Sequence, residues 1–397
     1  MVGGGPAGIA TALFLSAAAP DLTDRIVVLE KERYPREKPC AGALGARGDA
    51  ALASIGVIVD VPSVPIDGLA VRALGRTAIV REPKVGRVVR RFEFDAALAA
   101  VAKRRGIDVR DGVRATALEQ HDDGVTVRTT NGDLRADVVV GADGVSGFVR
   151  RALGFGPAPH LAQAIEVDTE PVATDLDRDV LLFDLSDRSY PGYYWDFPTL
   201  VDGRPMVCRG VYYLKSASTG PVEIEDVLAR ELAARGLELG AYAKRRYAER
   251  GFDPRGPVSV PRVLLVGEAA GVDPVTGEGI AQAIQFGSFA GRYLAERIRE
   301  RDFRFSDSMR RVHGASVGRD LRVRCAALAL AYGTRRPSIE RFLLDTPDFV
   351  RVGLQHFAGR RWSRAAALRA AKNAASATFA HFLGMDSVSP VRAERLP

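Results

Sequence analysis

The sequence predicts an α/β protein: a Rossmann-like, dinucleotide-binding domain interleaved with an antiparallel-sheet substrate domain, plus a helical C-terminal region. Three observations lead to this fold class. A glycine-rich fingerprint opens the chain, two later apolar runs end in glycine and an acid, and aromatic and β-branched residues fill the stretch between those two runs. Because α/β sheets bind ligands at the carboxyl ends of their strands, we expect the three glycine-rich turns to converge on one cofactor.

The fingerprint occupies residues 1–8, Met-Val-Gly-Gly-Gly-Pro-Ala-Gly, and an apolar, helix-forming stretch follows over residues 9–19. In the pattern G-x-G-x-x-G, Gly3 permits the tight turn, Gly5 lets the backbone approach a pyrophosphate, and Gly8 allows close packing of helix and strand. The N-terminus of the helix then faces the phosphates with its free N–H groups.

A strand-like run, residues 25–29, follows this helix and ends on Glu30. An acid about 20 residues after the fingerprint can hydrogen-bond ribose hydroxyls, so the segment is typical of a dinucleotide-binding βαβ unit rather than of an ordinary glycine-rich turn. Only Met1 and Val2 precede the fingerprint, whereas a strand usually has about five residues. We therefore expect either an artificially late start or a first strand reduced to a stub.

Two further segments have the continuous apolar character of buried parallel strands. Residues 136–144 end in Gly-Ala-Asp-Gly, and residues 263–268 end in Val-Gly-Glu. Residues 277–280 then open a long helix that we expect to reach about Glu300. The N–H groups at the start of this helix can stabilise a negative charge on a bound ring.

The patterns divide the chain into three regions. The expected nucleotide-binding domain comprises residues 1–60, 85–160 and 255–300, the substrate domain residues 61–84 and 161–254, and the helical C-terminal region residues 301–397. Helical periodicity predicts a helix over residues 223–249, and Pro, Arg and Gly predict a loop over residues 35–48. The Arg-rich tail is expected to be a solvated helix face, with contact to a membrane surface as the alternative.

Composition limits the classes of function. The 397 residues carry a net charge of +7, which is short of a nucleic-acid-binding tail but permits contact with anionic lipid. Cys40, Cys208 and Cys325 show no metal-ligand spacing, so no metal site is expected and a reducing, cytoplasmic setting fits best. No apolar run approaches the ~20 residues that span a bilayer, so we expect a soluble protein that is cytoplasmic or membrane-peripheral.

The three glycine-and-acid motifs occur in the order found in FAD-dependent hydroxylase-fold flavoproteins, and within that group the chain resembles the geranylgeranyl reductase family. Residues 34–42, Tyr-Pro-Arg-Glu-Lys-Pro-Cys-Ala-Gly, are similar to that family's Pro-Arg-x-Lys-x-Cys-Gly-Gly loop. Residues 193–198, Tyr-Tyr-Trp-Asp-Phe-Pro, are similar to its Tyr-x-Trp-x-Phe-Pro segment. Arg91 with Phe94-Asp95 matches an Arg and Phe-Asp pair before the family's flavin-domain helix.

The resemblance implies that the protein binds FAD and reduces C=C bonds of a hydrophobic, isoprenoid substrate by hydride transfer from the reduced flavin. It implies NADPH or a ferredoxin-like protein as the electron donor. It also implies that Cys40 lies near the flavin ring and that Tyr193 and Trp195 line the pocket above it, which makes these three the expected catalytic residues. The expected cofactor-binding residues are Gly3, Gly5, Pro6, Ala7, Gly8, Glu30, Lys31, Arg36, Cys40, Ala41, Gly42, Arg91, Asp143, Gly144, Gly267, Glu268, Gly277, Gly279 and Ile280.

Some positions depart from the family pattern. Glu268 stands where the family usually has Asp, which moves the carboxylate by ~1.5 Å, and Thr199 stands where Lys often follows Phe-Pro. Asp196 adds a carboxylate to the aromatic segment, and the Cys loop reads Cys-Ala-Gly. Two alternatives therefore stay open. One is an FAD-dependent monooxygenase or halogenase of a hydrophobic or natural-product substrate, although no catalytic Lys is evident. The other is a non-catalytic FAD- or lipid-binding protein.

Overall fold

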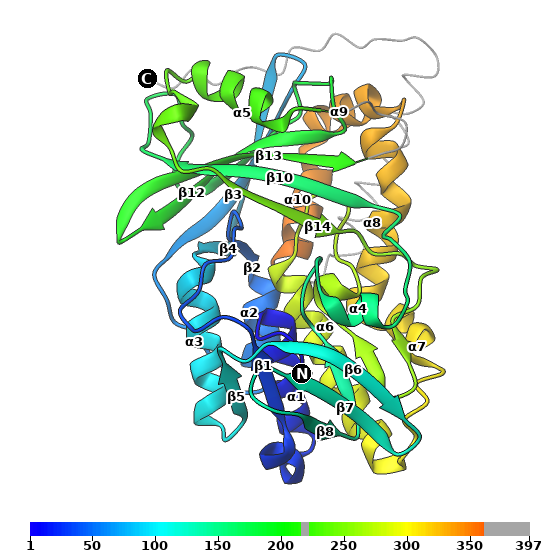
Figure 1. Ribbon diagram of the computed structural model, residues 1–397. Helices are drawn as coiled ribbons and strands as arrows, with labels where there is room; N and C mark the ends of the chain where they lie inside the picture. Colours follow the sequence, from blue (N-terminus) through cyan, green and yellow to red (C-terminus); the bar gives the residue numbers. More distant parts are fainter. Residues whose placement is uncertain (216–221, 361–397) are drawn as a thin grey trace.

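The computed structural model describes residues 1–215 and 222–360. Two sheets organise these residues, a small parallel sheet in the lower half of Figure 1 and a large mixed sheet in the upper half. Helices cover both, and the helices of the C-terminal region extend along one side of the molecule from the lower half to the upper half. The structure confirms the predicted fold class.

The parallel sheet forms around the first residues of the chain. Strand β1 (Val27–Glu30) pairs with β5 (Asp108–Asp111), and β9 (Val139–Gly141) pairs with β16 (Val263–Leu265), both in parallel. Val2 joins the two pairs, since it bridges Leu29 on one side and Gly141 on the other. Its N–H donates to Val140 O at 2.8 Å and its carbonyl accepts from Ala142 N at 2.7 Å. The expected stub of a first strand is therefore present at the centre of the sheet.

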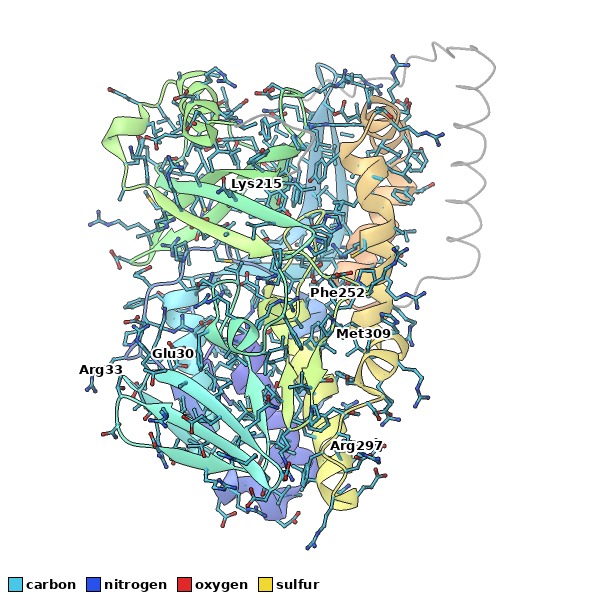
Figure 2. All side chains as sticks on the ribbon, turned by 45° about the vertical axis from the view of Figure 1, so that its right-hand side comes forward. Glu30, Arg33, Lys215, Phe252, Arg297 and Met309 are labelled. Carbon is cyan, nitrogen blue, oxygen red and sulfur yellow. The ribbon has the colours of Figure 1, made fainter. Side chains whose placement is uncertain are left out.

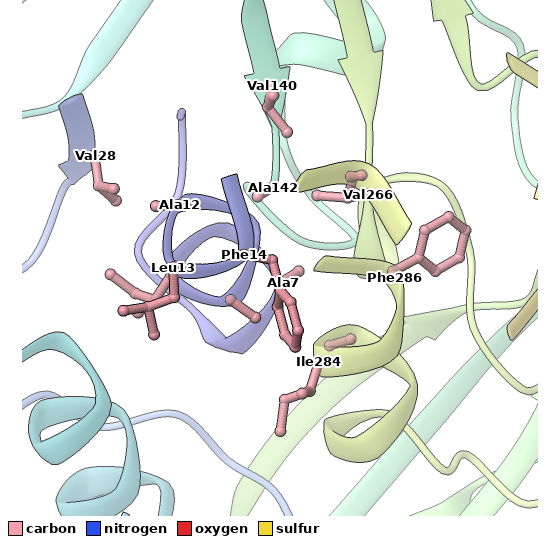
Figure 3. Close-up of a cluster of buried hydrophobic side chains, with 14 of the residues drawn as sticks. Ala7, Ala12, Leu13, Phe14, Val28, Val140, Ala142, Val266, Ile284 and Phe286 are labelled. Carbon is pink, nitrogen blue, oxygen red and sulfur yellow. The ribbon is translucent and has the colours of Figure 1, made fainter. Parts of the chain in front are cut away.

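Two helices pack closely beneath this sheet, α1 (Pro6–Ala18) and α6 (Ile280–Glu300). Glycines on α6 allow the close approach: a Cβ on Gly287 would lie 2.6 Å from the Cβ of Ala10, and one on Gly291 would lie 2.5 Å from Leu15 N. Figure 3 shows Phe14 of α1 beside Ile284 of α6. Leu13, Phe286, and Val28 and Val140 of the sheet belong to the same buried cluster. This packing fixes the starts of both helices next to the strand ends.

The large sheet has eight strands. Their order is β14 (Arg245–Arg250), β10 (Leu161–Thr169), β13 (Arg204–Lys215), β12 (Gly192–Val201), β11 (Val180–Asp184), β3 (Ser63–Ala73), β4 (Arg76–Val89) and β2 (Ala43–Gly45). All neighbours are antiparallel except β11 and β3, which are parallel. Helix α5 (Ile224–Ala233) packs on one face of β10 and β13.

Helices of the C-terminal region pack against the other face of the large sheet. They are α8 (Ser316–Tyr332), α9 (Arg336–Asp345) and α10 (Pro347–Phe357), preceded by α7 (Ser308–Gly314). The remaining elements are α2 (Ala46–Ala53), α3 (Arg91–Arg104), α4 (Phe148–Ala152), the short helices η1 (Pro20–Arg25), η2 (Leu239–Ala241) and η3 (Gly267–Ala269), strand β15 (Ser259–Val260), and the small sheet of β6 (Ala115–His121), β7 (Gly124–Thr129) and β8 (Leu134–Ala136).

Three local predictions were wrong. The helix predicted over residues 223–249 ends at Ala233, and its last part is strand β14. The loop predicted over residues 35–48 contains β2 and the start of α2. The prediction that the Arg-rich tail is a solvated helix face was also wrong for Arg336. This residue is buried and donates to three backbone carbonyls. Strand β4 runs uninterrupted across the expected domain boundary at residues 84 and 85, and residues 361–397 of the expected helical tail lie outside the described residues.

Within residues 1–215 and 222–360, no helix is long and apolar enough to cross a membrane. In the same part of the chain, no group of three or more His, Cys, Asp or Glu side chains is arranged to hold a metal ion.

Candidate cofactor and substrate site

The fingerprint turn has the geometry that its glycines predict. Gly3 has φ +106°, and a Cβ at this position would lie 2.3 Å from Ala142 O. A Cβ on Gly8 would lie 2.0 Å from Gly3 O. Pro6 begins α1, and Ala7 is buried in its first turn. The glycine-rich turn at the start of the chain therefore packs directly against the turn that follows β9.

Gly5 faces two arginines. The nearest atoms to a Cβ placed on it are Nη2 of Arg36 at 3.7 Å and Nη2 of Arg91 at 3.8 Å. Arg91 forms a bidentate pair with Asp95 at 2.7 Å, and Arg36 lies 3.0 Å from Asp95 and 3.3 Å from Glu30. Two largely buried guanidinium groups beside a helix N-terminus suit an anion such as a pyrophosphate.

Glu30, labelled in Figure 2, lies at the end of β1 and holds the glycine turn in place. Its Oε2 accepts the N–H of Gly4 at 3.0 Å, and its Oε1 accepts the N–H of Glu32 at 3.1 Å. Tyr34 completes the arrangement, since its hydroxyl donates to Gly4 O. Lys31, the neighbour of Glu30, is exposed.

The second and third turns meet the first. A Cβ on Gly144 would lie 3.5 Å from Oε2 of Glu268, and a Cβ on Gly267 would lie 2.6 Å from the Cβ of Ala7. Both glycines have positive φ, +79° and +58°. Asp143 accepts the N–H of Val149 at the start of α4 at 3.0 Å. The three glycine-and-acid turns thus converge, as the sequence predicts.

Asp143 keeps one oxygen free for a further partner. Its Oδ1 is buried and has no hydrogen-bond partner within the described residues. Burial raises the pKa of this carboxyl group above its usual range, although the N–H of Val149 opposes the shift. A ligand hydroxyl next to Oδ1 would satisfy it, since buried polar groups are normally hydrogen-bonded.

The Cys loop is fixed to the large sheet. The N–H of Cys40 donates to Oε1 of Glu166 at 3.0 Å, and the N–H of Gly42 lies 3.4 Å from the Cys40 sulfur. Gly42 has φ +86°, and a Cβ there would lie 2.1 Å from Val89 O. Burial raises the pKa of the Cys40 thiol, so the sulfur stays protonated at neutral pH.

A loop before α6 is held by tyrosines. Helix α6 begins at Ile280 after Gly279, and Gly277 has φ +68°. Three tyrosine hydroxyls donate to consecutive carbonyls of this loop: Tyr212 to Pro274 at 3.0 Å, Tyr332 to Val275, and Tyr193 to Thr276 at 2.6 Å. Because these tyrosines come from β12, β13 and α8, the large sheet and the C-terminal region together set the position of the loop.

An apolar cavity of about 350 Å³ lies between the large sheet and the C-terminal helices. The loops at residues 40–42 and 277–280 line it together with the aromatic face of the sheet. The helices contribute residues such as Tyr332, Leu343, Val350, Leu354 and Phe357. The structure therefore brings the Cys loop, the start of α6 and an apolar space together at one place.

Tyr193 and Trp195 share the cavity face of β12, as residues two positions apart in a strand do. Their ring centroids are 6.1 Å apart, and Trp195 Nε1 is buried with no partner among the described residues. Tyr194 and Asp196 lie on the opposite face, where Arg235 stacks 4.3 Å above the Tyr194 ring and pairs with Asp196.

Sequence reasoning missed two parts of this site. Tyr247 and Glu249 line the cavity from β14, and their two-residue spacing is the signal that could have identified a strand. A buried ionic cluster behind the loop was also missed. It consists of Arg47, Asp273, Glu278, Asp320, Arg324 and His356.

Comparison with known proteins agrees with this geometry. A family model described as an FAD binding domain matches residues 1–183. Digeranylgeranylglycerophospholipid reductase 2 of Methanopyrus kandleri is 30% identical over 326 residues, which cover 76% of this chain and 78% of that protein. The reductase 2 of Methanosphaera stadtmanae is 27% identical over 331 residues, with 76% and 79% covered.

A solved structure has the same fold. The geranylgeranyl bacteriochlorophyll reductase-like protein of Thermoplasma acidophilum superposes with a TM-score of 0.71 at 23% identity, covering 96% of this chain and 98% of its own.

Proposed function

Because the chain belongs to the geranylgeranyl reductase family of FAD-dependent oxidoreductases, we propose that it reduces C=C bonds of a hydrophobic, isoprenoid substrate. The observation that carries this proposal is the apolar cavity of about 350 Å³, which extends from the Cys loop and the start of α6 to helices α9 and α10. Aromatic and aliphatic side chains line it, as expected for a site that binds a flexible hydrocarbon chain.

The residues around the three turns fit FAD. The open face of Gly5 between Arg36 and Arg91 accommodates a pyrophosphate, and the unpartnered Asp143 Oδ1 can accept a hydrogen bond from a ribityl or ribose hydroxyl. When bound and reduced, FAD supplies a hydride for the alkene. Backbone N–H groups at Gly277, Gly279 and Ile280 are proposed to hold the flavin ring.

The cavity residues position the substrate. Tyr193 and Trp195 line one wall of the cavity, against which the alkene would pack, and Cys40 with Ala41 and Gly42 would border the flavin. The C-terminal helices cover one side of the cavity and so limit the access of water to the reacting carbons, and a fixed orientation lowers the barrier to hydride transfer. These roles, including that of Cys40, stay proposals that substitution can test.

The reductase reaction is tested by anaerobic turnover. The purified protein should absorb near ~450 nm, as oxidised flavin does. With dithionite as the reductant and geranylgeraniol as the substrate, the product should gain two hydrogens for each double bond reduced. A flavin-loaded protein that leaves every prenyl double bond intact under these conditions would contradict the proposal.

The electron donor and the location are part of the same proposal. We infer that NADPH or a ferredoxin-like protein reduces the flavin, and that the protein is cytoplasmic with peripheral contact to the membrane that holds its substrate. Bleaching of the ~450 nm band by NADPH or by reduced ferredoxin identifies the donor. Sedimentation with anionic lipid vesicles tests the membrane contact.

The monooxygenase or halogenase alternative makes different demands. Halogenation needs a catalytic lysine near the pocket, and none lines the cavity in the described part of the chain. A monooxygenase would consume oxygen in proportion to its product, whereas the proposed reductase turns over without oxygen.

A further inference from the structure

Glu249 is an acidic residue at the wall of an apolar cavity. It lies on the edge strand β14 opposite Ala162 of β10, and it lines the cavity together with Tyr247. Its Oε2 is buried and has no hydrogen-bond partner within the described residues. An ionised carboxylate without a partner would be destabilised by several kcal/mol at such a site, so the arrangement favours the neutral acid.

The carboxyl group lies at the cofactor end of the cavity. A Cβ placed on Gly277 would lie 2.5 Å from Glu249 Oε2, so the acid contacts the loop proposed to hold the flavin ring. Cys40 and Gly279 line the same cavity. A substrate double bond that lies against the flavin is therefore near the Glu249 carboxyl group.

The surroundings favour the protonated form of this group. Burial raises the pKa of Glu249 well above its usual range, and the negative charges of Glu268, Asp273 and Glu166 raise it further. The positive charge of Lys38 opposes the shift. A carboxylic acid that is neutral near pH 7 can act as a general acid, because efficient proton donors have a pKa near the working pH.

Tyr247 also lines the cavity, and burial raises its pKa well above the usual range of a tyrosine, which makes it a weaker acid than a carboxyl group. Several other protic side chains at the cavity have different tasks. The hydroxyls of Tyr193, Tyr212 and Tyr332 donate to loop carbonyls, so their protons are already engaged. Burial raises the pKa of the Cys40 thiol above an already high ordinary value, which makes it a weaker acid than a carboxyl group. Glu166 is held by the N–H of Cys40 and by Arg245.

We propose that Glu249 is the proton donor of the reduction, an inference that rests on the function proposed above. The O–H bond of Glu249 breaks and its proton forms a C–H bond at one alkene carbon, while the other carbon receives a hydride from the reduced flavin. The alkene is thereby reduced and the flavin oxidised. Glu249 is left as a carboxylate, which takes up a proton from water before the next turnover.

The substitution Glu249→Gln keeps the size of the side chain but removes the acidic proton. We expect it to bind FAD and to be bleached by dithionite like the unsubstituted protein, but to reduce prenyl double bonds about 10²–10⁴-fold more slowly. Glu238→Gln, at an exposed glutamate, is the matched control and should keep full activity. An E249Q protein that turns over at the unsubstituted rate would overturn the inference and leave the proposed function intact.

A pH profile separates Glu249 from Cys40. The unsubstituted protein should lose activity as the pH rises through the raised pKa of Glu249, because the donor is then ionised. Cys40→Ser should keep this fall in activity, whereas the residual rate of E249Q should not show it. If Cys40→Ser abolishes the pH dependence and E249Q keeps it, the thiol is the donor and the inference is wrong.

Infrared difference spectroscopy gives a readout that does not need turnover. The difference between the unsubstituted protein and E249Q should contain the C=O stretch of a protonated carboxyl group at pH 7. A carboxylate band in its place would refute the inference even if no prenyl substrate were reduced. If the protonated band is present but FAD-loaded protein reduces no alkene, the proposed function fails instead.

Discussion

Glu166 on β10 accepts the backbone N–H of Cys40 with its Oε1 at 3.0 Å, although the two residues are 126 positions apart. The same oxygen accepts the Nε–H of Arg245 at 3.1 Å. One fully buried carboxyl group thus fixes the Cys loop, β10 and the edge strand β14 relative to one another. The wall that carries Glu249 and the loop proposed to border the flavin depend on the same contact.

Removing this carboxyl group should loosen the Cys loop. Glu166→Ala leaves the Arg245 guanidinium and the Cys40 N–H with a partner missing, so we expect a loss of about 3–5 kcal/mol in the free energy of unfolding. Glu166→Gln keeps an acceptor and should lose about 1–3 kcal/mol. Urea titration measures both losses. The rate at which a thiol reagent modifies Cys40 should rise in the same order, and equal rates in all three proteins would contradict the assignment.

The second and third glycines of the fingerprint, Gly5 and Gly8, should behave differently from each other. A Cβ on Gly8 would lie 2.0 Å from Gly3 O, whereas the nearest atoms to a Cβ on Gly5 are 3.7 Å away. Gly5→Ala should therefore fold with a nearly unchanged melting temperature but lose FAD, because the methyl group occupies the space through which the pyrophosphate approaches. Gly8→Ala should be destabilised by about 1–3 kcal/mol or more. Melting curves and flavin absorbance of both variants check this contrast.

The three tyrosines that hold the loop before α6 should act on cofactor affinity. Each Tyr→Phe change at positions 193, 212 and 332 removes one hydrogen bond of about 0.5–1.5 kcal/mol. We expect the triple variant to bind FAD about 10- to 100-fold more weakly, which follows if half or more of that free energy supports the bound state. Fluorescence titration with FAD measures the change. Tyr242→Phe, whose hydroxyl bonds Glu170 far from the loop, should leave the affinity unchanged.

The cofactor half of the site follows closely from the sequence. Gly3, Gly8 and Gly267 are needed because backbone or Cβ atoms approach them directly, and glycine is the residue that sequence reasoning detects best at such places. The stub at Val2 was also predictable, because a parallel sheet of this type needs a central strand. Short sequence patterns therefore suffice to predict a turn whose conformation requires glycine.

The substrate half was predictable only in part. Tyr193 and Trp195 were found from the resemblance to the geranylgeranyl reductase family, but Glu249 was missed because charged residues on both faces of β14 resemble a polar helix more than a strand. Arg324 was missed for a different reason. It pairs with Asp273, Glu278 and Asp320, and most of these partners are distant in sequence. A buried ionic cluster of this kind has no periodicity from which it could be recognised.

That ionic cluster should make stability depend on pH. Burial raises the pKa of Asp320, but the hydrogen bond from His356 and the charges of Arg324 and Arg47 lower it more, so the net shift is well below the usual range. A carboxyl group with a lowered folded-state pKa stabilises the fold above its unfolded pKa of about 4. This stabilisation is lost as the pH falls below that value.

Asp320→Asn removes the charge and so removes this contribution. We expect the variant to be about 3–5 kcal/mol less stable at pH 7, since two buried arginines lose a charged partner. We also expect its stability to fall less steeply than that of the unsubstituted protein as the pH is lowered from about 5 to 3. Urea midpoints at several pH values measure both effects. Asp133→Asn changes an exposed aspartate and should reproduce the dependence of stability on pH seen in the unsubstituted protein. If stability falls equally steeply with pH in D320N and in the unsubstituted protein, Asp320 does not titrate with a lowered pKa. Because Arg324 also contacts Thr276 in the loop before α6, FAD affinity of the unsubstituted protein should decline over the pH range in which it begins to lose its cluster, whereas that of D320N should depend less on pH over this range.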